Sequence, residues 1–243
     1  MKYALPDNLS KLHAAEEDLR GKALAILSTK EDAQLHIQMV EAAMDMADVF
    51  RQFATTDEDL KVVQVLGMRT FNAFGAALKL ALAGYSQKSA MIMRDILETT
   101  FLMDLFRGDR SEIEKWRLID KKARKTKYGP FQVRVKLDSR YGDTEKKRAE
   151  HYEMLSELAG HPSMRADIMM RPTPLGDAVI GPFIEVVMLE AVVSELGRLA
   201  IMVGENLEAF IPDASDHAVA SRLGFAALKR RWLLTFYGVG AVN

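Results

Sequence analysis

The sequence of 243 residues lacks cysteine altogether. This absence excludes zinc fingers, iron–sulfur clusters, thiol nucleophiles and disulfide scaffolds, and it fits a reducing compartment. Only seven residues are proline, and the alternating β-branched runs that are typical of strands are nearly absent. Long apolar runs are missing too, because the most apolar stretch, residues 178–204, is interrupted by Glu185, Glu190, Glu195 and Arg198. We therefore expect a helical protein without a membrane-spanning segment.

The N-terminal residues have little of the character of a targeting segment. Acidic residues at positions 7, 16, 17 and 18 interrupt the first twenty residues, which argues against a secretory or transit peptide. The chain is 49% hydrophobic and 28% charged, so it has enough apolar material for one sizeable core. Internal repeats and Gly/Ser-rich linkers are absent. The sequence thus predicts a cytoplasmic protein with a single helical domain over residues 1–243.

Apolar residues recur almost everywhere at the three-to-four spacing of amphipathic helices. Ser, Thr or Asp residues before acidic turns mark helix starts, and glycines and prolines mark helix ends. The expected helices span residues 8–27, 30–54, 57–83, 86–107, 111–127, 143–159, 175–210 and 214–237. Only Gln132–Leu137 alternates as a strand does, and we expect a strand or a short extended loop there. The predicted fold is an all-α bundle of about eight helices, with its core in residues 57–210.

The sequence motifs of several large enzyme classes are also absent. The chain contains no P-loop, no dinucleotide-binding glycine motif, no nucleophile elbow and no zinc-binding His-Glu-x-x-His motif. It lacks the Glu-x-x-His pairs with which helical bundles hold two iron or manganese ions. No metal site and no small-molecule cofactor are expected.

Charge is unevenly distributed along the chain. Residues 110–148 hold fourteen Lys or Arg against six Asp or Glu, a local charge of +8 in a chain whose total is −1. The densest part contains Lys121, Lys122, Arg124, Lys125 and Lys127, closely followed by Tyr128 and Phe131. Helical spacing places positions 121, 124, 125 and 128 on one face, where they suit a phosphate backbone with stacked bases. The alternative is a solvated face without a ligand.

A pair of opposite charges lies within a strongly apolar expected helix. Arg94 and Glu98 are four residues apart and share a face. The same face carries Ala90, Met91, Leu97 and Phe101. We therefore expect both charges inside the core. A buried ion pair keeps its place only when it is well hydrogen-bonded, so the pair is either a structural lock or part of a site.

A second motif closes the helix expected at residues 143–159. In Tyr152-Glu-Met-Leu-Ser156-Glu-Leu-Ala-Gly160-His161-Pro162, the glycine stops the helix and the proline holds His161 at its exit. Tyr152 and Ser156 lie on the inner stripe of the helix. Imidazole is suited to proton transfer near neutral pH, although lone histidines are more often structural. The other four histidines, at positions 13, 36, 151 and 217, are expected on the surface.

Together these two motifs carry a resemblance. Arg94-Asp-Ile-Leu-Glu98, followed about sixty residues later by Tyr152–Pro162, resembles a family of uncharacterised bacterial all-helical proteins with R-x-x-x-E and Y-x-x-L-S...H-P motifs. That family is in turn similar to the HEPN superfamily, whose helical bundles often dimerise and include metal-independent ribonucleases of toxin and phage-defence systems. The matching stretch covers residues 87–163. The resemblance implies an HEPN-like core with additional terminal helices, a homodimer, and RNA as the partner.

The resemblance also implies roles for individual residues. The HEPN nuclease signature, an Arg followed about four to six residues later by a His, does not occur in this chain: Arg148 to His151 is too short a spacing, and Arg148 to His161 is too long. An altered site would bring Arg94 to the transferring phosphate and use His161 for proton transfer. Glu98 would orient one of them, and Tyr152 and Ser156 would be supporting donors. The alternative is a non-catalytic binding or scaffold protein in which Arg94, Glu98 and His161 form a structural hydrogen-bond lock.

Overall fold

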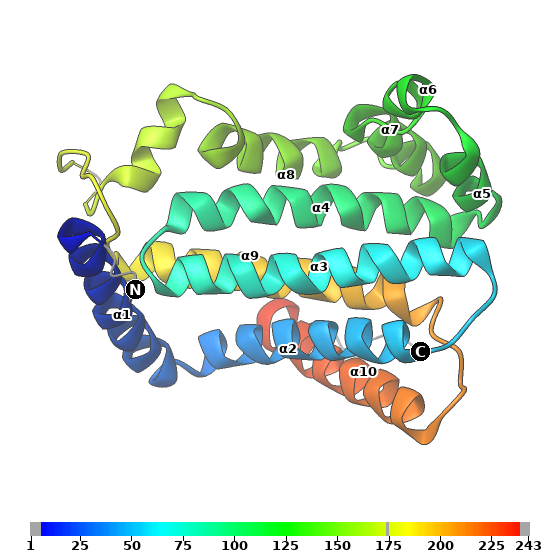
Figure 1. The fold of residues 1–243 in the computed structure, drawn as a ribbon, viewed down its shortest axis with the longest axis horizontal. Helices are drawn as coiled ribbons and strands as arrows, with labels where there is room; N and C mark the ends of the chain where they lie inside the picture. Colours follow the sequence, from blue (N-terminus) through cyan, green and yellow to red (C-terminus); the bar gives the residue numbers. More distant parts are fainter. Residues whose placement is uncertain (1–5, 174, 239–243) are drawn as a thin grey trace.

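Four long helices lie side by side at the centre of the computed structural model, which describes residues 6–173 and 175–238 (Figure 1). They are α2 (Glu31–Gln52), α3 (Glu58–Leu82), α4 (Ser86–Gly108) and α9 (Val186–Glu208). α1 (Asp7–Ser28) crosses one end of this bundle, and α10 (Asp216–Tyr237) packs against α2. The described residues form ten α-helices and no strand, which confirms the predicted all-α class.

The long connection between α4 and α9 covers the outer side of α4. It consists of α5 (Ser111–Leu118), α6 (Lys121–Lys127), α7 (Pro130–Tyr141), α8 (Lys147–Leu155), a π-helix (Ser156–Gly160) and a 3-10 helix (Met164–Met170). α4 is contacted by α5, α7, α8, the π-helix and the 3-10 helix, and Figure 1 shows the connection extending along it. The basic segment and the Tyr152–Pro162 motif both belong to this connection. They are therefore held beside the helix that carries Arg94 and Glu98.

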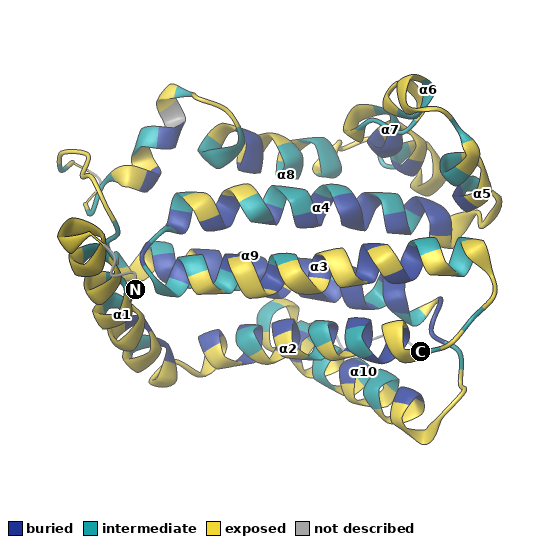
Figure 2. Ribbon diagram, in the orientation of Figure 1, coloured by how far each residue is buried: buried dark blue, intermediate teal, exposed yellow. Residues whose placement is uncertain are grey.

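One contiguous cluster of buried apolar side chains fills the bundle (Figure 2). α2, α4 and α9 contribute most of it, because each presents apolar residues at helical spacing to its neighbours. The cluster reaches from Ala23 in α1 to Trp232 in α10. α1 buries only Ala23 and Leu27 and is otherwise largely exposed. No helix in the described part of the chain is both long and apolar enough to cross a membrane.

Two expected helices are shorter or broken in the structure. The helix expected at 111–127 is interrupted at Asp120, whose carboxylate accepts hydrogen bonds from the backbone N–H groups of Lys122 and Ala123 and so begins α6. The helix expected at 175–210 begins only at Val186, and the residues 175–185 before it are irregular. In both places a carboxylate within the expected range caps the helix that follows: Asp120 caps α6, and Glu185 caps α9.

The strand or loop expected at Gln132–Leu137 is wrong, because this segment lies inside α7. Val133 and Leu137 are four residues apart, so they share a helical face as well as one side of a strand, and both are buried. Pro130 begins α7 at a position that needs no N–H donor. Gly142 ends it with a φ of 63°, in the left-handed conformation that favours glycine.

Candidate functional site

Arg94 joins the two sequence motifs in space. Its Nη2 donates a hydrogen bond to the Tyr152 hydroxyl at 2.6 Å and lies 3.2 Å from Glu98 Oε1. The guanidinium also packs on Gly160, where an added Cβ would fall 2.5 Å from Arg94 Nη1. The lack of a side chain at Gly160 therefore makes room for the guanidinium.

Two guanidinium groups lie over the ring of Tyr152. Arg94 Cζ is 4.9 Å from the ring centroid, and Arg134 Cζ is 4.0 Å from it. Arg134 comes from α7, is only 8% exposed, and has a buried Nη1 that finds no hydrogen-bond partner among the described residues. Arg134 is absent from the residues expected in the site, because the sequence of its segment predicts a strand or a short extended loop. The signal that could find it is the helical spacing of Val133 and Leu137.

The Arg94–Glu98 pair is half-buried and does not lie inside the core, contrary to expectation. The two side chains are 21% and 30% exposed. Arg94 is covered by Tyr152 of α8 and Gly160 of the π-helix, whereas Glu98 borders a cleft. Water therefore reaches the edge of the pair, and the desolvation that the pair must overcome is smaller than for a buried pair.

His161 directly follows the π-helix, and its side chain is exposed. Its backbone N–H donates to the Ser156 carbonyl at 3.0 Å and closes the last π-helical turn. The imidazole forms no hydrogen bond with any described residue. The buried Ser156 hydroxyl donates to the Tyr152 carbonyl at 2.7 Å. The structure thus brings Arg94, Glu98 and Tyr152 together, leaves His161 beside them at the helix exit, and directs Ser156 to the backbone.

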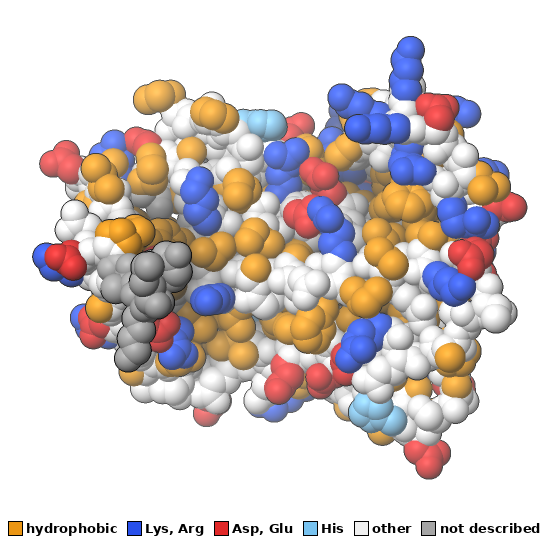
Figure 3. Space-filling view, viewed as in Figure 1, with side chains coloured by type: hydrophobic (Ala, Val, Ile, Leu, Met, Phe, Trp, Pro, Cys, Tyr) orange, Lys and Arg blue, Asp and Glu red, His pale blue; other side chains and the backbone are white. Residues whose placement is uncertain are grey.

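A cleft of about 500 Å³ lies between α3, α4 and the α5–α7 region, and we name it the α6 cleft. Its charged lining residues are Arg69, Asp95, Glu98, Lys121, Arg124 and Lys125, and its aromatic ones include Trp116 and Tyr128. The four positions expected on one helical face, 121, 124, 125 and 128, all line it. Figure 3 shows Lys and Arg side chains gathered over α5–α7 beside an apolar patch.

Arg124 belongs to the scaffold of the α6 cleft. Its Nε donates to the carbonyl of Trp116 at 3.0 Å, and its Nη2 donates to those of Arg117 and Ile119 at 3.3 and 3.0 Å. These carbonyls lie at the C-terminal end of α5, which a helix leaves without intrahelical donors. Arg124 Cζ also lies 4.7 Å from the Trp116 ring centroid. Arg124 therefore fixes α6 to α5.

The lysines of α6 have no counter-ion among the described residues. Lys121, Lys122, Lys125 and Lys127 are all exposed, and none forms an ion pair or a side-chain hydrogen bond there. Elsewhere in the basic segment, six cations form ion pairs: Lys115, Arg117, Lys136, Arg140, Lys147 and Arg148. The unpaired positive charge of the segment is therefore densest on α6.

Glu112 pairs with two lysines on the elements that flank α6. It lies 2.8 Å from Lys115 Nζ and 2.7 Å from Lys136 Nζ. Burial alone would raise the pKa of Glu112, but the two lysines lower it to about 2. Burial, together with the Glu112 carboxylate, raises the pKa of Tyr128 to about 12, so that its hydroxyl stays neutral and can donate a hydrogen bond.

Two histidines expected on the surface are in fact enclosed, whereas His13 and His217 are exposed as expected. His36 is 5% exposed and accepts a hydrogen bond at Nδ1 from Trp232 Nε1 at 2.9 Å. Burial lowers the pKa of His36 to about 4, so it is neutral at pH 7. The half-buried His151 pairs through Nε2 with the buried Glu195. Helical periodicity gave no sign of either partner, because both come from distant helices.

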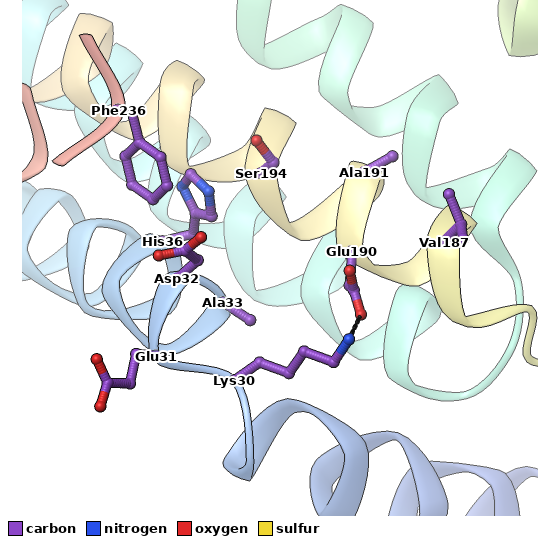
Figure 4. A pocket seen from close by; sticks show the side chains of 10 residues that line it. All are labelled: Lys30, Glu31, Asp32, Ala33, His36, Val187, Glu190, Ala191, Ser194 and Phe236. Carbon is purple, nitrogen blue, oxygen red and sulfur yellow. Dashed lines mark ion pairs between the residues drawn. The ribbon is translucent and has the colours of Figure 1, made fainter. Parts of the chain in front are cut away.

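His36 also borders a cavity of about 730 Å³ between α2 and α9 (Figure 4). Its ring stacks on Phe236 with 4.4 Å between centroids. Lys30 and Glu190 form an ion pair of 2.5 Å along another wall, and Asp32 lies beside His36. The carboxylates here outnumber the cations, so this cavity does not suit a phosphate backbone.

Within residues 6–173 and 175–238, no group of three or more acidic or histidine side chains is placed to hold a metal ion. No family model, curated protein or solved structure matches the chain. The geometry of the α6 cleft and of the Arg94 contacts is therefore the basis of the functional proposal.

Proposed function

We propose that the protein binds single-stranded RNA in the α6 cleft. One observation supports this above all: Lys121 and Lys125 line a cleft with an aromatic wall and have no carboxylate partner in the described structure. Phosphates of an RNA backbone supply the missing counter-charges. Trp116 and Tyr128 also line the cleft, with Arg124 over the Trp116 ring and Lys136 over the Tyr128 ring. Unpaired bases can stack on aromatic side chains, whereas the bases of a duplex are already stacked on one another.

The HEPN-like architecture and the homodimer form part of the same proposal. They are supported by the motif resemblance over residues 87–163 and by the all-α bundle into which both motifs fold. A stress or defence setting follows from the same resemblance.

RNA binding is tested with a fluorescein-labelled single-stranded RNA of mixed sequence, by fluorescence anisotropy at several KCl concentrations. The charge-reversal variant Lys121→Glu/Lys125→Glu is expected to weaken binding by about tenfold or more, because two phosphate contacts become repulsive. For the wild type, the logarithm of affinity should fall with the logarithm of salt by about 0.7 for each phosphate neutralised.

The matched control is Lys11→Glu/Lys88→Glu, which makes the same change of net charge at two exposed lysines outside the α6 cleft. This variant should keep most of the wild-type affinity. Equal losses in both variants would mean that net charge and not the cleft attracts the RNA. Absence of binding by the wild type at low salt would refute the proposal.

Cleavage of the bound RNA without a metal ion is a sharper form of the proposal. Glu98 both lines the α6 cleft and pairs with Arg94, whose guanidinium packs on Gly160 immediately before the exposed His161. This series of contacts supports a site in which the Glu98 carboxylate and the Arg94 guanidinium act together with the imidazole of the residue that follows Gly160. In this form Arg94 stabilises the phosphate transition state, and His161 transfers a proton.

The cleavage test uses a fluorogenic RNA substrate in the presence of EDTA. His161→Ala should lower the rate by about 10²–10⁴-fold, the usual contribution of a general acid or base, and should change the free energy of unfolding by less than about 0.5 kcal/mol. RNA that is bound but left intact by the wild type would favour the non-catalytic alternative. The engagement of Arg94 with Tyr152, Glu98 and Gly160 fits a structural lock in that case, and the exposed His161 stays outside it.

A further inference from the structure

A second cavity, of about 350 Å³, lies against the N-terminal half of α4, between α8, the π-helix, the 3-10 helix and α9. Its walls are mainly methionine, leucine, isoleucine, valine and alanine side chains, among them Met93, Met154, Met169 and Met188. Methionine side chains are flexible and adapt to apolar ligands of differing shape. An apolar lining with a few convergent polar groups, in a cavity of this size, is the usual form of a small-molecule site.

Among the described side chains that line this cavity, the polar ones are Ser194, Glu195 and Arg198 on α9. Both oxygens of the Glu195 carboxylate are engaged, Oε1 by His151 Nε2 and Oε2 by Arg198 Nη1 at 3.4 Å. The Arg198 side chain is 53% exposed, and its Nε and Nη2 donate to no described residue. The hydrogen-bond donors that remain open at this end of the cavity are therefore the Nε and Nη2 groups of Arg198.

The π-helix gives an independent indication. Leu158 of the π-helix lines the cavity, and so does Leu155, which directly precedes it. Turns of π-helix are rare and are found frequently at functional sites. Gly160, at one end of this π-helix, packs on Arg94, whereas Leu158 of the same π-helix lines the cavity.

We propose that this cavity binds a medium-chain carboxylate, with its apolar chain among the methionines and its carboxylate at Arg198. The planar guanidinium offers paired N–H donors that match the two oxygens of a carboxylate. Both Glu195 oxygens are already engaged, by His151 and Arg198, so the groups left open are the Nε and Nη2 donors of Arg198, which suit an acceptor head group. The cavity shares no lining residue with the α6 cleft, so this site is independent of RNA binding.

The experiment uses isothermal titration calorimetry on the full-length protein. It compares three probes with the same ten-carbon alkyl chain, each kept below its critical micelle concentration. Decanoate should bind saturably at one site per chain, decanol more weakly, and decyltrimethylammonium not measurably. Arg198→Gln should weaken decanoate binding by about tenfold or more through loss of a charge-assisted contact, and it should leave decanol binding unchanged.

The position of the site is tested by filling the cavity. Ala90→Leu adds volume at its buried wall and should abolish decanoate binding. Ala218→Leu makes the same change at a pocket between α2 and α10 that shares no lining residue with this cavity, and it should not. Met154→Trp narrows the cavity from an exposed position and covers the case in which Ala90→Leu fails to fold. No saturable decanoate binding, or binding unaffected by both filling variants, would overturn the site. Equal affinity for decyltrimethylammonium would overturn the assignment of a carboxylate.

Discussion

Arg94 and the α6 lysines are cations on neighbouring elements, yet they are used in opposite ways. Arg94 extends from α4 toward α8 and the π-helix, and its guanidinium contacts Tyr152, Glu98 and Gly160. The α6 lysines stand on a short helix, face water, and contact no carboxylate in the part of the chain that is described. The first arrangement holds elements of the fold together, and the second leaves positive charge available to a ligand.

The difference shows that local charge in the sequence is a poor guide to charge at the surface. Most arginines of the basic segment are engaged with carboxylates or carbonyl groups, because a guanidinium can donate in several directions at once. The lysines divide according to their neighbours: Lys115 and Lys136 share Glu112, whereas Lys121 and Lys125 have none. The net +8 of residues 110–148 therefore reduces to a much smaller patch centred on α6.

The largest effect on stability is expected at Arg94. Arg94→Ala should lower the free energy of unfolding by about 2–3 kcal/mol, because it removes a charged hydrogen bond to Tyr152, an ion pair and a cation–π contact. The control is Arg69→Ala, whose ion pair with Asp95 is largely exposed and should contribute at most about 1 kcal/mol. Urea denaturation of both variants measures the difference. Equal losses of unfolding free energy in the two variants would show that the contacts of Arg94 stabilise the fold no more than an exposed ion pair does.

A somewhat smaller effect is expected for Glu112, and it should depend on pH. The folded pKa of Glu112 is about 2, below its ordinary value of 4.5, so its contribution is fully present above pH 4.5 and is lost as the pH falls toward 2. The wild type should therefore exceed Glu112→Gln in unfolding free energy by about 2 kcal/mol at pH 7 and by much less at pH 2.5.

Glu114→Gln is the matched control for this pH dependence, because Glu114 is exposed on the same helix and forms no ion pair in the described residues. Denaturant titrations at a series of pH values supply the comparison. A difference between wild type and Glu112→Gln that stays constant from pH 7 to pH 2.5 would show that Lys115 and Lys136 are not neutralised by Glu112.

The smallest effects separate two adjacent residues of α6. Arg124→Ala should cost about 1–2 kcal/mol, because it leaves carbonyls at the end of α5 without their donor. Lys125→Ala should change stability by less than about 0.5 kcal/mol and should instead weaken RNA binding. Thermal unfolding and anisotropy on the same two proteins test both statements. If Arg124→Ala instead weakened RNA binding and Lys125→Ala lowered stability, Arg124 would be the RNA-binding residue and Lys125 the structural one.

The helical class follows directly from the apolar spacing, but several boundaries do not. Asp120 resembles an ordinary acidic residue within a continuous helix, and only the fold shows its carboxylate capping α6. Gln132–Leu137 fits two periodicities equally well over so short a stretch, and burial of Val133 and Leu137 against the bundle decides for the helix. Short connecting helices are therefore the part of this fold that sequence patterns describe least well.

The candidate site is predictable to the extent that its contacts are local. The i, i+4 spacing of Arg94 and Glu98 predicts their ion pair, and the one-face spacing on α6 predicts which positions line the cleft. The contact between Arg94 and Tyr152 depends on how α8 lies against α4, and no single-chain periodicity reports that. The burial of His36 depends in the same way on Trp232, near the other end of the chain.

The π-helix at Ser156–Gly160 makes the length of this segment more consequential than its composition. A π-helical turn accommodates one more residue than an α-helical turn. Deleting a single residue here would restore an ordinary α-helix and rotate everything after it by about 100°. The contact between Gly160 and Arg94 would be lost, and Leu158 would no longer line the cavity proposed to bind a carboxylate. One inserted residue thus sets the register of two separate sites, and a deletion that an irregular loop such as residues 175–185 tolerates would here displace both together.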